Sequence, residues 1–155
     1  MKAITVCQPY AELVLLGEKR VENRVWTPGF TGPLLIHAGK SREWLNSFFP
    51  LPTHMDFGGI VGICELAACF PLKAIREFKV PQTYWDLADH EHTEGPHCWV
   101  LKNVVRFPSM IPLPGRQGLF DVPENVFLPS LQAMRAAQTI TRETVESFLR
   151  DPERA

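Results

Sequence analysis

The chain has 155 residues, of which 45% are hydrophobic and 21% charged, and its formal net charge at pH 7 is −1. These values are typical of one globular domain and exclude a wholly disordered chain. The nearly neutral balance argues against a protein that coats duplex nucleic acid, which would normally be basic. The charge is uneven, however: residues 1–44 hold six Lys and Arg against four Asp and Glu, which leaves room for a local basic cleft.

No apolar run reaches the roughly 18–20 residues that a bilayer-spanning helix needs. Gln8, Pro9 and Glu12 interrupt the apolar N-terminus, where a signal peptide would need a continuous core. We therefore expect a cytoplasmic protein without membrane contact. The cysteines form no C-x-x-C pair, so we expect reduced, buried thiols at Cys7, Cys64, Cys69 and Cys98.

The first half of the sequence predicts short elements separated by Pro and Gly turns. A helix is expected after Pro9, which suits a first helical turn, and it should end at Gly17. A second short helix is expected over residues 40–48, with Ser41 as its N-cap. The strands predicted by apolar and β-branched runs are residues 2–7, 20–26, 32–38 and 59–69.

The second half predicts a helix over residues 72–78 and an acidic, His-bearing loop over residues 86–96. A strand over residues 98–101, a Pro-broken edge or connector over residues 106–114 and a closing strand over residues 119–122 follow. Beyond Pro129, apolar residues recur at helical spacing and predict two short amphipathic helices, the second capped by Thr141. Their apolar positions are Leu131, Met134, Ala137, Val145, Phe148 and Leu149.

This mixture of short strands and helices predicts an α+β fold with a small, partly open, mixed β-barrel flanked by short helices. Residues 1–127 are expected to form the domain. Residues 128–155 are too few to fold alone, so we expect a C-terminal helical extension packed on or near the barrel.

Four blocks of sequence carry a resemblance to a known family. Gln8 to Arg24 (QPYAELVLLGEKRVENR) resembles the opening signature of ASCH domains, in which QPWA or QPYA leads a helix and G-x-K-x-x-E-x-R follows. The blocks that agree in order are GPLLIHAGK (32–40), GGIVGICELAACF (58–70) and WVLKNVVRFPSMIPLPGRQGLFDVP (99–123). The resemblance covers about residues 2–127 and is closest to the cointegrator-type and vertebrate endothelial-type members. It implies a PUA-like barrel whose mouth holds RNA or a nucleotide.

Three charged residues of the first block suit such a cleft. Glu22 and Arg24 are two apart on a strand, so their side chains leave the same face, and Lys19 can turn toward that face from a loop. The two cations could meet a phosphate or base edge while Glu22 accepts from a base amino group. The alternative is a surface ion-pair ladder. The ASCH resemblance, whose cleft is lined by this motif, favours the first interpretation.

Other candidate ligand contacts flank the predicted barrel mouth. Gln8 could read a base or cap the following helix, and His37, beside Lys40, could contact the ligand or serve as a hydrogen-bonded structural histidine. Trp26 and Trp44 are candidates for base stacking, although aromatic residues at such positions are more often core.

The glycine-flanked pair Arg116 and Gln117 is another candidate, because glycines let a backbone approach a ligand closely. The alternative is a plain hairpin tip. We expect no cofactor and no metal site, since the spacing of His90, His92, His97 and Cys98 matches no zinc motif.

The leading functional expectation is therefore the binding of single-stranded RNA or a nucleotide-like ligand in a cationic cleft. A hydrolase is the first alternative, with Lys19, Glu22 and His37 as its catalytic candidates. Some small bacterial ASCH proteins hydrolyse N4-acetylcytidine through a Lys, a Thr nucleophile and a Glu, and another member is a ribonuclease. Lys19 matches that Lys, but Glu22 occupies the Thr position. The second alternative is a protein-interaction module that joins a complex through the C-terminal helices.

Overall fold

The computed structural model describes residues 1–150 and contains one six-stranded mixed sheet in the order β2-β5-β4-β3-β1-β6. The strands are β1 (Lys2–Val6), β2 (Val21–Arg24), β3 (Gly32–Ala38), β4 (Gly59–Pro71), β5 (His97–Pro112) and β6 (Leu119–Asp121). The helices are α1 (Tyr10–Leu15), α2 (Leu72–Arg76), the 3₁₀ helix η1 (Gln82–Asp89), α3 (Glu124–Ala136) and α4 (Arg142–Leu149).

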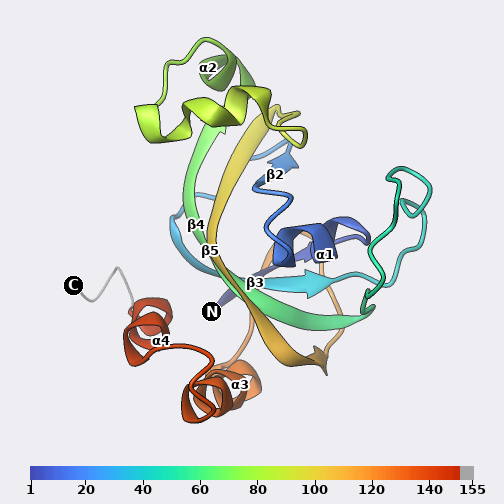
Figure 1. Cartoon of the computed structure of the whole chain (residues 1–155), viewed down its shortest axis with the longest axis vertical. Helices are drawn as coiled ribbons and strands as arrows, with labels where there is room; N and C mark the ends of the chain where they lie inside the picture. Colours follow the sequence, from blue (N-terminus) through green and yellow to red (C-terminus); the bar gives the residue numbers. More distant parts are fainter. Residues whose placement is uncertain (151–155) are drawn as a thin grey trace.

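The sheet curls into a half-barrel around its two longest strands, β4 and β5 (Figure 1). Strands β1 and β3 pair in parallel, whereas each other neighbouring pair is antiparallel. Helices α2 and η1 cap one end of the β4–β5 pair, and α3 and α4 lie toward the opposite end. The α+β fold with a small mixed barrel and short flanking helices is thus confirmed.

The expected break between a strand at residues 98–101 and a Pro-broken edge or connector at residues 106–114 is wrong, because one strand runs from His97 to Pro112. The expected edge position is confirmed, since β2 pairs only with residues 97–100 and leaves β4 as the one strand neighbour of the rest of β5. Pro108 is tolerated within it because the register slips there: Gly62 pairs with Arg106, but Ile60 pairs with Ile111. Proline is compatible with a strand at such a bulge, where no ladder hydrogen bond is required. A second register break, between Ile63 and Glu65, accommodates Asn103, whose φ is 51°.

The helix expected over residues 40–48 is also wrong, since these residues form turns and bends. Ser41 Oγ does accept a hydrogen bond from the Glu43 amide, as an N-cap would, but no helix propagates from it. A segment this short cannot offset the cost of helix nucleation unless one face packs on a core. Trp44 of this segment and Phe49 directly after it are exposed, so that packing is missing.

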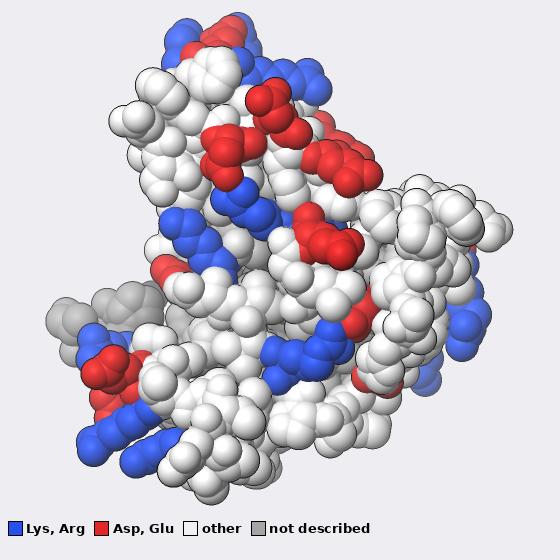
Figure 2. All heavy atoms as spheres, in the orientation of Figure 1, with Lys and Arg blue, Asp and Glu red and all other residues white. Residues whose placement is uncertain are grey.

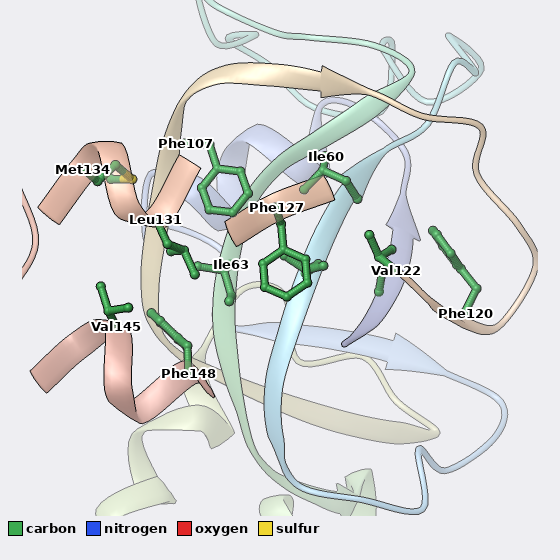
Figure 3. Close-up of a cluster of buried hydrophobic side chains, with 12 residues drawn as sticks. Ile60, Ile63, Phe107, Phe120, Val122, Phe127, Leu131, Met134, Val145 and Phe148 are labelled. Atoms are coloured by element: carbon green, nitrogen blue, oxygen red, sulfur yellow. The ribbon is translucent and has the colours of Figure 1, made fainter. Parts of the chain in front are cut away.

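The C-terminal helices pack against the barrel and extend its core (Figure 3). Phe127 and Leu131 of α3 and Phe148 of α4 are buried with Ile63 of β4. Helix α3 begins at Glu124, earlier than the expected start beyond Pro129, and it continues across residues 127 and 128. Pro129 lies in its second turn, where it removes the hydrogen bond to the carbonyl of residue 125 and its ring crowds that carbonyl.

The predicted cap of the second C-terminal helix is confirmed, because Thr141 Oγ1 accepts a hydrogen bond from the Thr144 amide at 3.1 Å. The cysteines are free thiols, Cys64 and Cys98 being buried and Cys7 and Cys69 half-buried. None of the helices within residues 1–150 has both the length and the apolar character required to cross a membrane.

Because α3 contributes to the main core, truncating Leu131 should destabilise the whole domain. We expect Leu131→Ala to lower the free energy of unfolding by about 2–5 kcal/mol in one cooperative transition measured by urea denaturation. Gln132→Ala, on the exposed side of the same helix, should change it by less than ~0.5 kcal/mol. A separate, earlier transition for the C-terminal helices would contradict this shared core.

Candidate functional site

A pocket of about 740 Å³ opens where the carboxyl ends of β1 and β3 meet the loop of residues 113–118. This volume lies within the usual range for small-ligand sites. Its lining residues are Thr5, Arg24, Trp26, His37, Gly39, Lys40, Gly58, Leu113, Pro114, Gly115, Arg116, Gln117 and Gly118.

The charged side chains that line the pocket are all cationic: Arg24, Lys40 and Arg116. They come from three separate segments of the chain, and no Asp or Glu of residues 1–150 lines this pocket. Acidic side chains gather elsewhere, over the end of the molecule that carries α2 and η1 (Figure 2). The pocket is therefore a local cationic site on a protein of nearly neutral charge.

Arg24 reaches the pocket because the curled sheet brings its two sides together. In the sheet order, β5, β4 and β3 separate β2 from β1, yet Arg24 Nη2 donates to the Thr5 carbonyl at 2.7 Å. Arg24 Nε also lies 3.5 Å from Glu22 Oε1. The guanidinium thus links two distant strands and is held by a carboxylate beside the pocket.

His37 fixes the loop that forms the opposite wall. Its Nε2 lies 2.6 Å from the Leu113 carbonyl, which can only accept, so Nε2 carries the proton. Its Nδ1 lies 3.2 Å from Thr5 Oγ1. Gly115 passes directly over this pair: a Cβ there would stand 2.8 Å from both His37 Cε1 and Thr5 Oγ1. Only glycine allows the loop to lie so close.

Other lining side chains lie around the wall that His37 fixes. Lys40 packs its aliphatic part against Gly58, where an added Cβ would lie 2.9 Å from Lys40 Cε. The ring of Trp26 meets the buried Trp99 ring edge-on, with centroids 4.8 Å apart. Trp26 is therefore partly core, although its side chain also lines the pocket.

Six of the ten ligand candidates predicted from the sequence line the pocket: Arg24, Trp26, His37, Lys40, Arg116 and Gln117. The stacking candidate Trp44 is exposed and lies outside this lining. Gln8 does not line the pocket either. It is fully buried, its Oε1 accepts from the Glu12 amide at 2.9 Å, and its Nε2 donates to the Asp56 carbonyl at 2.8 Å. Of the two roles considered for Gln8, this geometry matches the structural one.

Lys19 and Glu22 are also absent from the pocket lining. Lys19 is buried, donates through Nζ to the Val21 carbonyl, and lies over the Tyr10 ring at 5.7 Å from its centroid. Burial lowers the pKa of the Lys19 ammonium, and the Glu22 carboxylate opposes that shift. Glu22 pairs with Arg24, so the predicted cluster exists, but only Arg24 faces the pocket.

Sequence reasoning missed two residues that position this region. Thr5 contacts His37 and the Arg116 carbonyl. The only feature of the sequence that could have indicated this role is that Thr5 is a polar residue inside an apolar strand. Asn23 points away from Glu22 and Arg24 and holds the loop that precedes β5. Its side chain bonds the His92 carbonyl and the amides of residues 94 and 95 at 2.7–3.0 Å.

The histidines of this loop have structural contacts. His90 Nε2 accepts from the Arg20 amide at 3.0 Å, and the His92 ring packs near Tyr10 and Phe48. Burial lowers the pKa of both imidazoles, which matches rings held in their neutral form. Within residues 1–150, no three His, Cys, Asp or Glu residues are grouped to hold a metal ion.

Comparison with solved structures supports the fold. Two mutant forms of the ASCH protein from Zymomonas mobilis align with TM-scores of 0.50 at 16% and 15% sequence identity. The alignments cover 84% and 85% of this chain and 96% and 94% of those chains. A comparison with curated proteins finds no match.

The sequence itself matches the family model of the ASCH domain over residues 4–110. The match includes most of β1, all of β2 to β4, most of β5 and the pocket residues Arg24, Trp26, His37 and Lys40, whereas Arg116 and Gln117 follow it. Because the match to the family model covers more than half of the chain, the protein belongs to the ASCH domain family, which has a PUA-like fold.

Proposed function

We propose that this ASCH domain binds RNA or a nucleotide in the pocket between β1, β3 and residues 113–118. The observation that carries the proposal is the charge of the lining: Arg24, Lys40 and Arg116 converge on a space that no carboxylate enters among the described residues. Phosphate groups are the natural partners of such a cluster, since arginine and lysine bind them through charge-assisted hydrogen bonds.

The remaining lining suits the base or sugar of a nucleotide. Trp26 presents an aromatic surface, and Gln117 carries an amide that can both donate and accept. The backbone of residues 113–118 is held close to the pocket by His37. A small number of cations also fits a single-stranded or mononucleotide ligand, because contacts to bases can substitute for dense phosphate neutralisation.

The alternatives receive less support. Lys19, the lysine that the amidohydrolase mechanism requires, is buried outside the pocket, and the described lining contains Thr5 but no carboxylate. His37, the other candidate acid or base, lines the pocket, but its ring nitrogens contact the Leu113 carbonyl and Thr5 Oγ1. The interaction hypothesis relied on apolar faces of the C-terminal helices. Those faces, including Leu131 and Phe148, are buried in the chain's own core.

We expect Lys40→Ala and Arg116→Ala each to weaken the binding of a short single-stranded RNA by about 1–3 kcal/mol in fluorescence anisotropy. Each should also reduce the slope of log Kobs against log salt by about 0.7, the contribution of one single-strand phosphate. These two positions are preferred to Arg24, whose loss would also break the contact between β2 and β1.

Lys73→Ala is the matched control, because Lys73 lies on α2 with 83% of its side chain exposed. Arg106 is unsuitable, since its guanidinium forms a two-pronged ion pair with the buried Glu12 carboxylate. Equal losses in Lys40→Ala, Arg116→Ala and Lys73→Ala would indicate diffuse charge attraction, and the pocket proposal would then fail.

The hydrolase alternative has its own test. Because Glu22 stands where the amidohydrolases carry their Thr nucleophile, we expect the purified protein to leave N4-acetylcytidine intact. Chromatography should detect no cytidine above a buffer blank over hours. Release of cytidine in molar excess over the protein would show turnover, and the assignment of a binding function without hydrolysis would have to be abandoned.

A further inference from the structure

Two large aromatic side chains are exposed at the end of the barrel that lies away from the pocket. The β4–β5 ladder begins beside the pocket, where Gly59 pairs with Pro112, and α2 and η1 connect the two strands at its far end (Figure 1). Phe78, just after α2, is 51% exposed, and Trp85 of η1 is 44% exposed. These two rings form an apolar patch, the Phe78–Trp85 patch, that is separate from the pocket.

The two rings of the patch are held in a fixed arrangement. Their centroids lie 5.8 Å apart with the ring planes at 72°, and Trp85 Nε1 donates to the Val80 carbonyl at 3.0 Å. Phe78 has a φ of 56°, and its amide bonds the Ile75 carbonyl where α2 ends. Glycine is the usual residue in this left-handed position at a helix end, and a bulky side chain there is strained. An exposed, strained phenylalanine points to a contact that its ring makes outside the chain.

Positive charge gathers on the α2 side of the patch. Residues 71–80 contain the cations Lys73, Arg76 and Lys79 and one carboxylate, that of Glu77. The two lysines pair with Glu77, at 3.9 and 3.1 Å. Arg76 is exposed and has no carboxylate within 4.0 Å among residues 1–150, so its charge is available to a partner.

Negative charge gathers on the η1 side of the patch. Residues 81–94 contain no Lys or Arg and four carboxylates, those of Asp86, Asp89, Glu91 and Glu94. Asp86 pairs with Arg20, whereas Asp89 and Glu91 are exposed and have no cation within 4.0 Å in the part of the chain that the structure describes. Acidic and basic side chains therefore lie next to each other at this end of the molecule, as Figure 2 shows.

We infer that the Phe78–Trp85 patch binds the same patch of a second copy of this chain, so that the protein forms a symmetric dimer. A two-fold axis through the patch brings the basic α2 side of each copy against the acidic η1 side of the other. A surface with aromatic residues between charges of opposite sign is therefore complementary to itself. RNA, which is negative throughout, would be repelled by the η1 side.

The dimer is expected to be weak and to leave the pocket open. Each copy exposes only two large rings here, so the interface lies at the small end of the usual range, with a Kd on the order of 10–100 µM. Sedimentation equilibrium of the full chain between about 5 and 500 µM should show the mass rise from 17.6 kDa toward twice that value.

Phe78→Gly separates an interface role of the ring from a structural one. The substitution removes the ring and relieves the strained φ, so we expect the Kd to rise at least about tenfold while the melting temperature of the monomer stays the same or increases. Trp85→Ala should also raise the Kd. Trp44→Ala is the matched control, because Trp44 is 45% exposed but lies outside the patch, and it should leave the Kd unchanged.

Charge reversal tests the pairing of opposite sides. Arg76→Glu and Asp89→Arg should each weaken self-association by about tenfold, since each places like charges in both halves of a symmetric interface. An equal mixture of the two variants should dimerise about as well as the wild type, because every repulsive pair then becomes an attractive one. RNA binding by both variants should equal that of the wild type, since the pocket lies at the other end of the ladder.

A single 17.6-kDa species at every concentration would overturn the inference and leave the pocket proposal intact. A dimer that persists in Phe78→Gly and Trp85→Ala would also overturn it, because the contact would then use another face. Failure of the mixed charge variants to associate would contradict the symmetric pairing. If the chain dimerises as expected but binds no RNA or nucleotide, the proposed function fails and the dimer stands.

Discussion

The bond from Arg24 to the Thr5 carbonyl joins two strands that three others separate in the sheet order. It can form only because the sheet curls until β2 approaches β1. Just beyond β2, Trp26 packs against the buried Trp99 of the neighbouring strand β5, and Trp99 Nε1 donates to the Trp26 carbonyl at 3.3 Å. Because Arg24 also pairs with Glu22, one guanidinium closes the barrel and supplies the pocket with a cation of fixed position. The site therefore depends on the closure of the sheet, and a local change at β2 would affect both.

The position of the pocket follows from the long antiparallel pair at the centre of the sheet. The β4–β5 ladder ends where Gly59 pairs with Pro112, so the chain enters β4 and leaves β5 at the same place. The loop before Gly59 and the loop after Pro112 must therefore face each other across the ends of β1 and β3. His37 lies at the end of β3, just before the first of these loops begins, and its Nε2 bonds the Leu113 carbonyl in the second loop. A buried histidine with both ring nitrogens engaged holds the wall of the pocket in place, and the cations lie around it.

Much of this arrangement could be predicted from the sequence, and the failures have physical causes. Two-residue alternation placed Glu22 and Arg24 on one face, and the strand at residues 32–38 has the bounds that its apolar run predicts. The sequence could not determine which partner a polar side chain would meet. Lys19 Nζ donates to the Val21 carbonyl, and Gln8 Nε2 donates to the carbonyl of the distant Asp56. Such contacts form only when the chain folds. Pro108 likewise indicated a broken strand because the bulge that accommodates it is a property of the β4–β5 pairing.

The central claim is that a nucleotide ligand occupies the cationic pocket and no other cavity of the domain. The most direct measurement is a crystal structure of the chain soaked with a mixture of nucleoside monophosphates. The account predicts density between Lys40 and Arg116, with a phosphate within hydrogen-bond distance of at least one of them. It would be contradicted by ordered nucleotide elsewhere with the pocket empty, for example in the apolar cavity of about 610 Å³ lined by Phe30, Phe127 and Phe148.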